Sequence, residues 1–78
     1  MSADMKEGYL IWNASFKRPD IMYQDSTYYG GLHCKNTLEA LIRGRWRSAR
    51  VEYHHCSDTW YLEGIENGAE ILWLIVRK

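Results

Sequence analysis

The chain has 78 residues, two cysteines and equal numbers of acidic and basic side chains, so its formal net charge is zero. This length predicts one domain, residues 1–78, near the lower limit at which a single core can hold a fold. Two cysteines are too few for a secreted disulfide framework. The first eight residues are polar, and the longest apolar run, 71–76, is too short to cross a membrane. We therefore expect a cytoplasmic protein with reduced thiols, no signal peptide and no membrane contact.

Aromatic residues and turn residues predict short strands in the first part of the chain. Four Trp and six Tyr are many for this length, and aromatic and β-branched residues favour strands. Residues 8–12 are predicted as a first strand, and 21–24 as a second one after a turn at Pro19. Gly30 and Gly31 supply a further turn behind two adjacent tyrosines.

The stretch YYGGLHC at 28–34 combines turn residues with a histidine and a cysteine. We interpret it as architecture rather than as an active site. The glycines let the chain turn, Leu32 and Cys34 pack inward, and His33 points the other way. Of the paired tyrosines we expect one in the core and the other, Tyr28, on a binding face.

The stretch 37–43 is open to two interpretations. Its apolar residues recur at helical spacing, so that one short helical turn would satisfy the pattern. Gly44 instead indicates a hairpin turn that leads into a strand running to Tyr53. We favour strand–turn–strand, because the apolar stretch is short and the glycine follows it directly.

The second half of the chain predicts a further hairpin that closes the sheet. Residues 59–62 are predicted as a strand, Asn67-Gly68 is a strong signal for a type I′ turn, and 71–76 is predicted as the last strand. Five to six short antiparallel strands at roughly ten-residue spacing predict a mostly β fold. We expect a small SH3-like barrel, with an OB-like barrel as the alternative.

Four segments stand in order along the chain: YYGGLHC, TLEALIRGRWRSARVEY, DTWYLEGI and LIVR. Together they resemble a family of small bacterial and phage proteins that is described only as a domain of unknown function. The pattern of that family runs GGLHCG-x-C, then a strand–Gly–Trp hairpin ending in TRIE, then DWYLxG, then VRI. The resemblance covers most of the chain. It implies a compact, mostly β, SH3-like fold in a bacterium or its mobile elements, and it implies no activity.

Two departures from that pattern bear on function. Where the family shows Cys-Gly-x-Cys, Cys34 is followed by Lys-Asn-Thr, so the second thiol of a redox or metal pair is missing. The last strand, 71–76, is apolar throughout, whereas polar residues and a glycine interrupt it in the family. Because a strand shows alternate residues to opposite faces, a core can take only about half of this run. The rest, around Leu72 and Trp73, must face a partner, a neighbouring segment or water.

Residues that could carry chemistry gather at two places, and neither has suitable spacing. His33, Cys34 and the run 54–56 contain enough zinc ligands in number, but neither cluster has the gap that lets both members reach one ion. A Cys–His nucleophile needs a base that faces the thiol, and adjacent strand residues face apart. We expect no metal, no cofactor and no catalytic residue, and we expect 54–57 to be a solvated hairpin loop.

Charges are unevenly distributed along this neutral chain. Five basic residues and one acidic residue lie between Lys35 and Arg50, whereas 51–76 contains no Lys or Arg. Three of the arginines flank Trp46 in the predicted hairpin. Small β-barrels bind single-stranded nucleic acid with such cationic and aromatic groups, but the zero net charge and the acidic second half make nucleic acid the second choice.

A protein partner is the preferred interpretation, because Arg, Trp and Tyr dominate interface hot spots and the terminal strand is more apolar than so small a core can use. The last strand is also a candidate edge for pairing two copies into a homodimer. From the chain's size and the resemblance we expect a non-catalytic phage or mobile-element protein in a bacterial host cell, most concretely an anti-CRISPR-like inhibitor of a host defence complex. The residues expected to contact a host or phage protein are Tyr28, Arg43, Arg45, Trp46, Arg47, Leu72 and Trp73.

Overall fold

The computed structural model of the chain describes residues 5–65 and 71–78. In these two ranges the chain forms six strands and no helix, so no helix there could cross a membrane. The mostly β fold expected from the sequence is confirmed. The strands are β1 (Glu7–Asn13), β2 (Arg18–Tyr23), β3 (Thr37–Ile42), β4 (Arg45–His54), β5 (Thr59–Glu63) and β6 (Ile75–Arg77).

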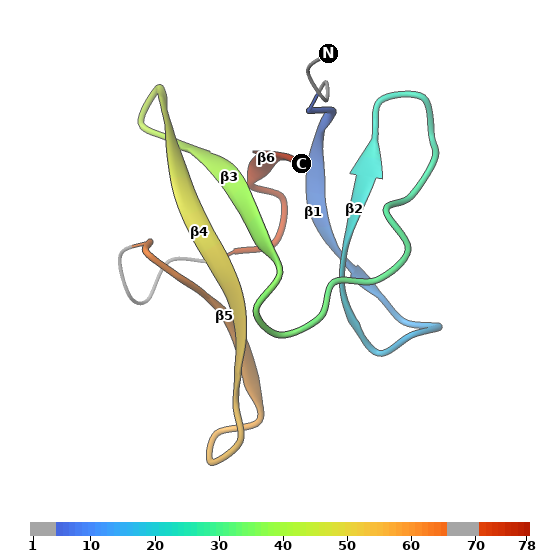
Figure 1. Cartoon of the computed structure of the whole chain (residues 1–78). Coiled ribbons are helices and arrows are strands. Elements are labelled where there is room, and N and C mark those ends of the chain that lie inside the picture. The colour runs from blue at the N-terminus through green and yellow to red at the C-terminus, as the bar shows by residue number, and fades with distance from the viewer. Residues whose placement is uncertain (1–4, 66–70) are drawn as a thin grey trace.

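All six strands form one antiparallel sheet in the order β2-β1-β6-β3-β4-β5 (Figure 1). The hairpin β1–β2 and the meander β3–β4–β5 lie side by side, and the short strand β6 joins them by pairing with β1 and with β3. The sheet does not close into the expected barrel. Its outermost strands, β2 and β5, do not pair with each other, and the edge of β2 is instead covered by the segment 27–32.

The last strand is shorter than expected and has different neighbours. It begins at Ile75 rather than at residue 71, because the backbone of Trp73 turns with φ +73° before it. The turn remains attached to β1: Trp73 N–H donates to the carbonyl of Leu10 at 2.5 Å, and Leu10 N–H donates to that of Leu74 at 2.9 Å. The predicted hairpin between 59–62 and the last strand is therefore wrong, and its expected turn at 67–68 lies outside the described residues.

The hairpin β3–β4 confirms the strand–turn–strand interpretation of its sequence. Its two-residue turn consists of Arg43 and Gly44, with φ of +53° and +80°. Positive φ at both central residues is the type I′ geometry, whose twist matches that of the flanking strands. No helical turn forms over 37–43.

The segment after β2 is held by the buried carboxylate of Asp20. Its Oδ1 accepts hydrogen bonds from the N–H groups of Ile21 at 2.8 Å, Gly30 at 2.9 Å and Gly31 at 2.8 Å. Asn13 Nδ2 donates to the other oxygen at 2.8 Å. Both glycines have positive φ, +111° for Gly30 and +98° for Gly31, so they are the residues that allow this close backbone approach.

The orientation of side chains in 28–34 differs in part from the expectation. Leu32 is fully buried, as expected, but Cys34 is exposed because it lies in a turn rather than in a strand. Tyr28 and Tyr29 are both exposed, at 54% and 40%, so neither lies in the core. The segment forms an outer edge bonded to β2 by its backbone, and its tyrosine rings are not covered by further strands.

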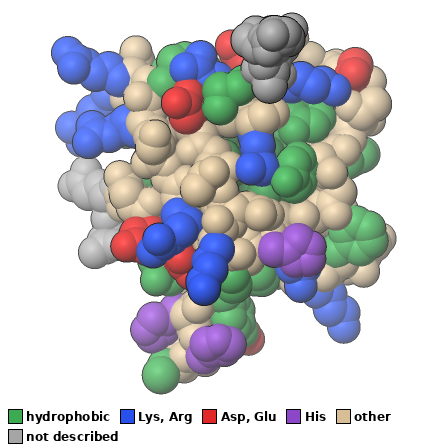
Figure 2. Space-filling view, in the orientation of Figure 1, with side chains coloured by type: hydrophobic (Ala, Val, Ile, Leu, Met, Phe, Trp, Pro, Cys, Tyr) green, Lys and Arg blue, Asp and Glu red, His purple; other side chains and the backbone are tan. Residues whose placement is uncertain are grey.

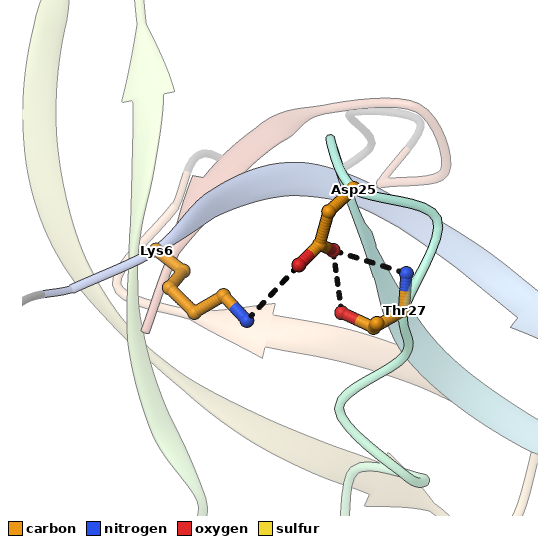
Figure 3. A network of polar contacts seen from close by, with 3 residues as sticks. All are labelled: Lys6, Asp25 and Thr27. Carbon is orange, nitrogen blue, oxygen red and sulfur yellow. Dashed lines mark hydrogen bonds and ion pairs between the residues drawn. The ribbon is translucent and has the colours of Figure 1, made fainter.

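The turn that leads out of β2 is fixed by Asp25 (Figure 3). Its Oδ1 accepts hydrogen bonds from the hydroxyl of Thr27 at 2.6 Å and from Thr27 N–H at 3.1 Å, and Lys6 Nζ lies 3.7 Å from Oδ2. The hydrogen bonds from Thr27, with a smaller contribution from the Lys6 charge, lower the pKa of Asp25. This network ties the residue before β1 to the turn after β2.

The core lies on one face of the sheet, and every strand contributes to it. In β1, Gly8 and Leu10 are buried while Tyr9 between them is exposed, which is the alternation expected of a half-buried strand. In β6, Val76 is fully buried while Ile75 is exposed. The buried apolar cluster consists of Leu10, Ile21, Tyr23, Leu32, Leu38, Ala40, Ala49, Val51, Leu62, Ile65 and Val76.

Candidate protein-binding surface

A continuous row of apolar side chains crosses the face of the sheet opposite the core. Directly paired residues of antiparallel strands share a face, so the register of the sheet identifies the row. Tyr9 pairs with Met22 on one side and with Ile75 on the other, and Met22 pairs in turn with Tyr28. We call the following residues the apolar row: Tyr28, Met22, Tyr9, Ile75, Leu41 and Trp46.

The second half of the row follows from the pairing of β6 with β3 and of β3 with β4. The ladder between β6 and β3 ends at the pair Ala40↔Val76, and Leu41 and Ile75 are the next residues of the two strands, on the face opposite to that pair. Leu41 is paired with Trp46. Six neighbouring strand positions at about 4.8 Å per step give a row of roughly 24 Å along the sheet.

The row is accessible, although its members are large and apolar. Tyr28, Tyr9 and Ile75 are exposed at 54%, 44% and 36%, and the other three members are half-buried. None of the six belongs to the core cluster or packs against it. The largest contiguous apolar patch of a small protein is often a functional contact surface, so the row is a candidate binding surface.

Trp73 extends this surface outward over the middle of the row. It is exposed at 65%, and its ring meets that of Tyr9 edge-on, with 6.2 Å between the centroids. The positive φ at Trp73 forms the tight turn that places the ring there. Leu72, which was expected to contact a partner with Trp73, lies half-buried in the same turn.

At its other end the row meets a polar margin. The guanidinium of Arg77 lies over the ring of Trp46, 4.2 Å from its centroid, and its Nε donates to Glu39 Oε1 at 2.6 Å. Beyond it lies a cleft of about 630 Å³ whose lining combines apolar residues such as Leu38 and Ala49 with the charged residues Arg50 and Glu63. Arg50 forms ion pairs with Glu52 and Glu63, so this cation is already neutralised within the chain.

The structure divides the residues that were expected to bind a partner. Tyr28 and Trp46 belong to the apolar row, and Trp73 stands beside it. Arg45 and Arg47 flank Trp46 in β4 and therefore point to the opposite face, while Arg43 lies in the turn. Figure 2 shows the basic side chains gathered over the β3–β4 turn. Trp46 and its two flanking arginines therefore lie on opposite surfaces of the sheet and do not form one cluster.

Four residues of the row were not singled out from the sequence: Tyr9, Met22, Leu41 and Ile75. Alternation in 71–76 already indicated that part of that strand faces away from the core. What the sequence does not state is the pairing of β6 between β1 and β3, which aligns these positions. Hairpin pairings are local, whereas this one joins residues that are far apart in the chain.

Ligand-type side chains do not assemble into a metal site within 5–65 and 71–78, where no group of three or more His, Cys, Asp or Glu could hold an ion. Cys34 and Cys56 are exposed free thiols. Arg18 Nη1 donates to Nδ1 of His33 at 2.7 Å, which occupies that ring nitrogen. Residues 54–57 are all exposed, as expected, although His54 is the last residue of β4 and the turn covers 55–58.

The fold and this surface define a class: a small open β-sheet domain with an apolar outer face. The chain belongs to the family described as a domain of unknown function, DUF5348, whose model matches residues 8–76. A solved structure, the crystal structure of a protein from Ruminococcus gnavus, is similar with a TM-score of 0.82 and 32% sequence identity, over 94% of this chain and 100% of that one. No curated protein matches the chain.

Proposed function

We propose that this domain is a non-catalytic binding module whose partner is a protein, bound at the apolar row and Trp73. The observation that carries the proposal is the uninterrupted apolar register across the outer face, with Tyr9, Tyr28 and Ile75 exposed. Aromatic side chains such as these supply much of the binding energy at interfaces for little entropic cost. The proposal assigns no catalytic residue and no cofactor.

The exposed apolar area of the row and Trp73 is smaller than one side of a standard protein–protein interface. Taking about 200 Å² for a whole large side chain, the exposed parts of Tyr9, Tyr28, Trp73 and Ile75 amount to roughly 400 Å². A standard interface covers about 800 Å² on each partner. The apolar row is therefore the centre of an interface whose rim includes polar groups such as Arg77 and Glu39.

The experiment is a comparison of two variants as bait in a lysate of the encoding bacterium. Y9T/W73N removes two exposed rings from the apolar surface; Thr favours strands, and Asn tolerates the positive φ at 73. Y61T removes an exposed ring from β5 and is the matched control. We expect a protein captured by the wild type and by Y61T to be lost with Y9T/W73N. Equal capture by all three forms would refute the proposal.

Light scattering of the purified chain separates a second copy from a different partner. If the wild type is a dimer and Y9T/W73N is a monomer, the apolar row is a self-association surface. If the wild type is a monomer, the row is available to bind a different protein. The narrower form of the proposal is a phage or mobile-element inhibitor of a host defence complex, acting in the cytoplasm of a bacterial host. The family resemblance and the chain's size are what support it, and the identity of the captured protein tests it.

Nucleic acid is a second candidate, favoured by one observation: Arg43, Arg45 and Arg47 form no ion pair with any described residue. Single-strand binding also uses stacked aromatic side chains, and Trp46 lies on the opposite face from Arg45 and Arg47. Recovery of nucleic acid without a protein band in the same capture experiment would favour this candidate over the first.

A further inference from the structure

A basic hollow lies at the β3–β4 turn, on the side of the sheet away from the apolar row. Its volume is about 350 Å³. Arg45 is paired with Ile42, which packs against the core, so both point to the core side of the sheet. The residues that line the hollow are Ile42, Arg43, Arg45, Arg47, Gly64 and Ile65.

None of the three arginines of the hollow forms an ion pair with a carboxylate among residues 5–65 and 71–78, in contrast to three cations elsewhere on the sheet and its ends. Arg50 is paired with Glu52 and Glu63, Arg77 with Glu39, and Lys6 with Asp25. The described lining of the hollow contains no acidic side chain. Three like charges around one concavity repel one another, and a bound anion relieves that repulsion.

The backbone around the hollow is constrained. Arg43 and Gly44 form a tight type I′ turn, which fixes the direction of the tip. At Gly64 an added Cβ would lie 2.8 Å from the carbonyl oxygen of Ser48, so the chain passes directly against β4. Ile65, which also lines the hollow, is buried in the core. The arginines therefore project from a preorganised frame, which lowers the entropic cost of binding.

We propose that this hollow binds an acidic segment of a protein partner, with Asp or Glu carboxylates paired to the guanidinium groups. Arginine is suited to this because its planar fork bonds a carboxylate at two points. A single-stranded nucleic acid is disfavoured because the hollow has no aromatic side chain in its described lining for base stacking. The inference concerns a different face from the apolar row and does not depend on the function proposed for that row.

The test uses two labelled probes, a decaglutamate peptide and a ten-nucleotide oligothymidylate, with fluorescence anisotropy as the readout at low and at physiological salt. R45Q/R47Q removes two cations from the hollow. K17N/K35N removes two exposed lysines elsewhere and is matched in net charge; asparagine suits the positive φ of +56° and +74° at these positions. We expect R45Q/R47Q to weaken decaglutamate binding at least tenfold, and K17N/K35N to weaken it less than twofold.

Three results would overturn the inference. Equal weakening by R45Q/R47Q and K17N/K35N would show that binding depends only on the net charge of the protein. Tighter binding of the oligothymidylate than of decaglutamate would assign the hollow to nucleic acid. Glu66 and Glu70 follow Ile65 in the sequence and lie outside the described residues, so E66Q/E70Q is measured as well. A tenfold gain of affinity in that variant would show that the chain's own carboxylates occupy the arginines. Amide chemical shifts that change at 42–47 and 64–65, but not at Tyr9 and Ile75, would support the assigned location.

Discussion

The carboxylate of Asp20 accepts a hydrogen bond of 2.8 Å from the backbone N–H of Gly31, eleven residues further along the chain. This bond and its neighbours attach the outer edge segment to β2. Burial raises the pKa of Asp20, but the hydrogen bonds from Gly31, Asn13, Ile21 and Gly30 outweigh it, so that the pKa is lowered. Asp20 is thus an organising residue of the fold.

D20N is expected to destabilise the domain by about 2 kcal/mol, because three backbone donors then share a weaker neutral acceptor and the new amide faces the amide of Asn13. Urea unfolding at pH 7 measures the loss. D25N is the control, since Asp25 also accepts hydrogen bonds but lies on the exposed surface, and we expect a smaller loss there. Similar losses in the two variants would contradict the role assigned to the buried site.

The stabilisation by Asp20 is expected to depend on pH in a defined direction. Its pKa in the folded state lies below the unfolded value of about 3.9, so the ionised form stabilises the fold above that pH. The contribution is lost as pH falls through the folded pKa. The difference in unfolding free energy between wild type and D20N should therefore be constant from pH 7 to about 5 and shrink below pH 4. A difference that stays constant down to pH 3 would mean that the charge is not its origin.

The two glycines bonded to Asp20 provide a matched pair of substitutions. An alanine Cβ at Gly30 would meet nothing within 4 Å, whereas at Gly31 it would lie 3.1 Å from Phe16 Cδ2 and 3.2 Å from Arg18 Cδ. Both positions have strongly positive φ, which costs on the order of 1–3 kcal/mol for a residue with a side chain. We expect both variants to lose stability in urea unfolding, G31A more than G30A. Equal losses of stability in G30A and G31A would show that the contacts of a Cβ at position 31 with Phe16 and Arg18 have no effect.

The local parts of this fold could be predicted from the sequence, and the non-local parts could not. Gly44 marks the β3–β4 turn because only a few residues accept positive φ, and the pairing of that hairpin follows from it. The short strand β6 pairs with β1 and β3, and no nearby residue specifies those neighbours. Trp73 was assigned to a strand because its side chain favours one, but its backbone adopts positive φ at the cost of that preference.

The candidate surface was predictable to the same extent. Tyr28, Trp46 and Trp73 were identified by residue type, since large aromatic side chains are typical of interfaces. The separation of Arg45 and Arg47 from Trp46 also follows from strand alternation, once 45–54 is known to be a regular strand. Asp20 was not anticipated, because a carboxylate after Arg-Pro resembles an exposed turn residue and its three backbone donors come from a distant loop.

Arg77 is expected to hold β6 against β3 by two interactions made at once. Its guanidinium stacks over Trp46 and bonds Glu39, which the compact ammonium of lysine cannot do together. R77K should lose about 1 kcal/mol of unfolding free energy, and R47K, at an exposed arginine of β4 on the far side of β3, should lose none that is measurable. A double-mutant cycle with E39Q checks the ion pair; a coupling energy of zero would show that the stacking alone acts.

Substitutions at two adjacent residues of β6 test the stability of the fold and the binding of a partner separately. Val76 is fully buried between β1 and β3, so V76T places a hydroxyl in the core and should cost about 2 kcal/mol. Ile75 faces the other way, and I75T should change the free energy of unfolding by less than about 1 kcal/mol because its side chain is already exposed and threonine favours strands. In the capture experiment I75T should nevertheless weaken retention of the protein partner. A stable I75T that retains the partner as well as the wild type would place the contact elsewhere than on the apolar row, because Ile75 lies at its centre.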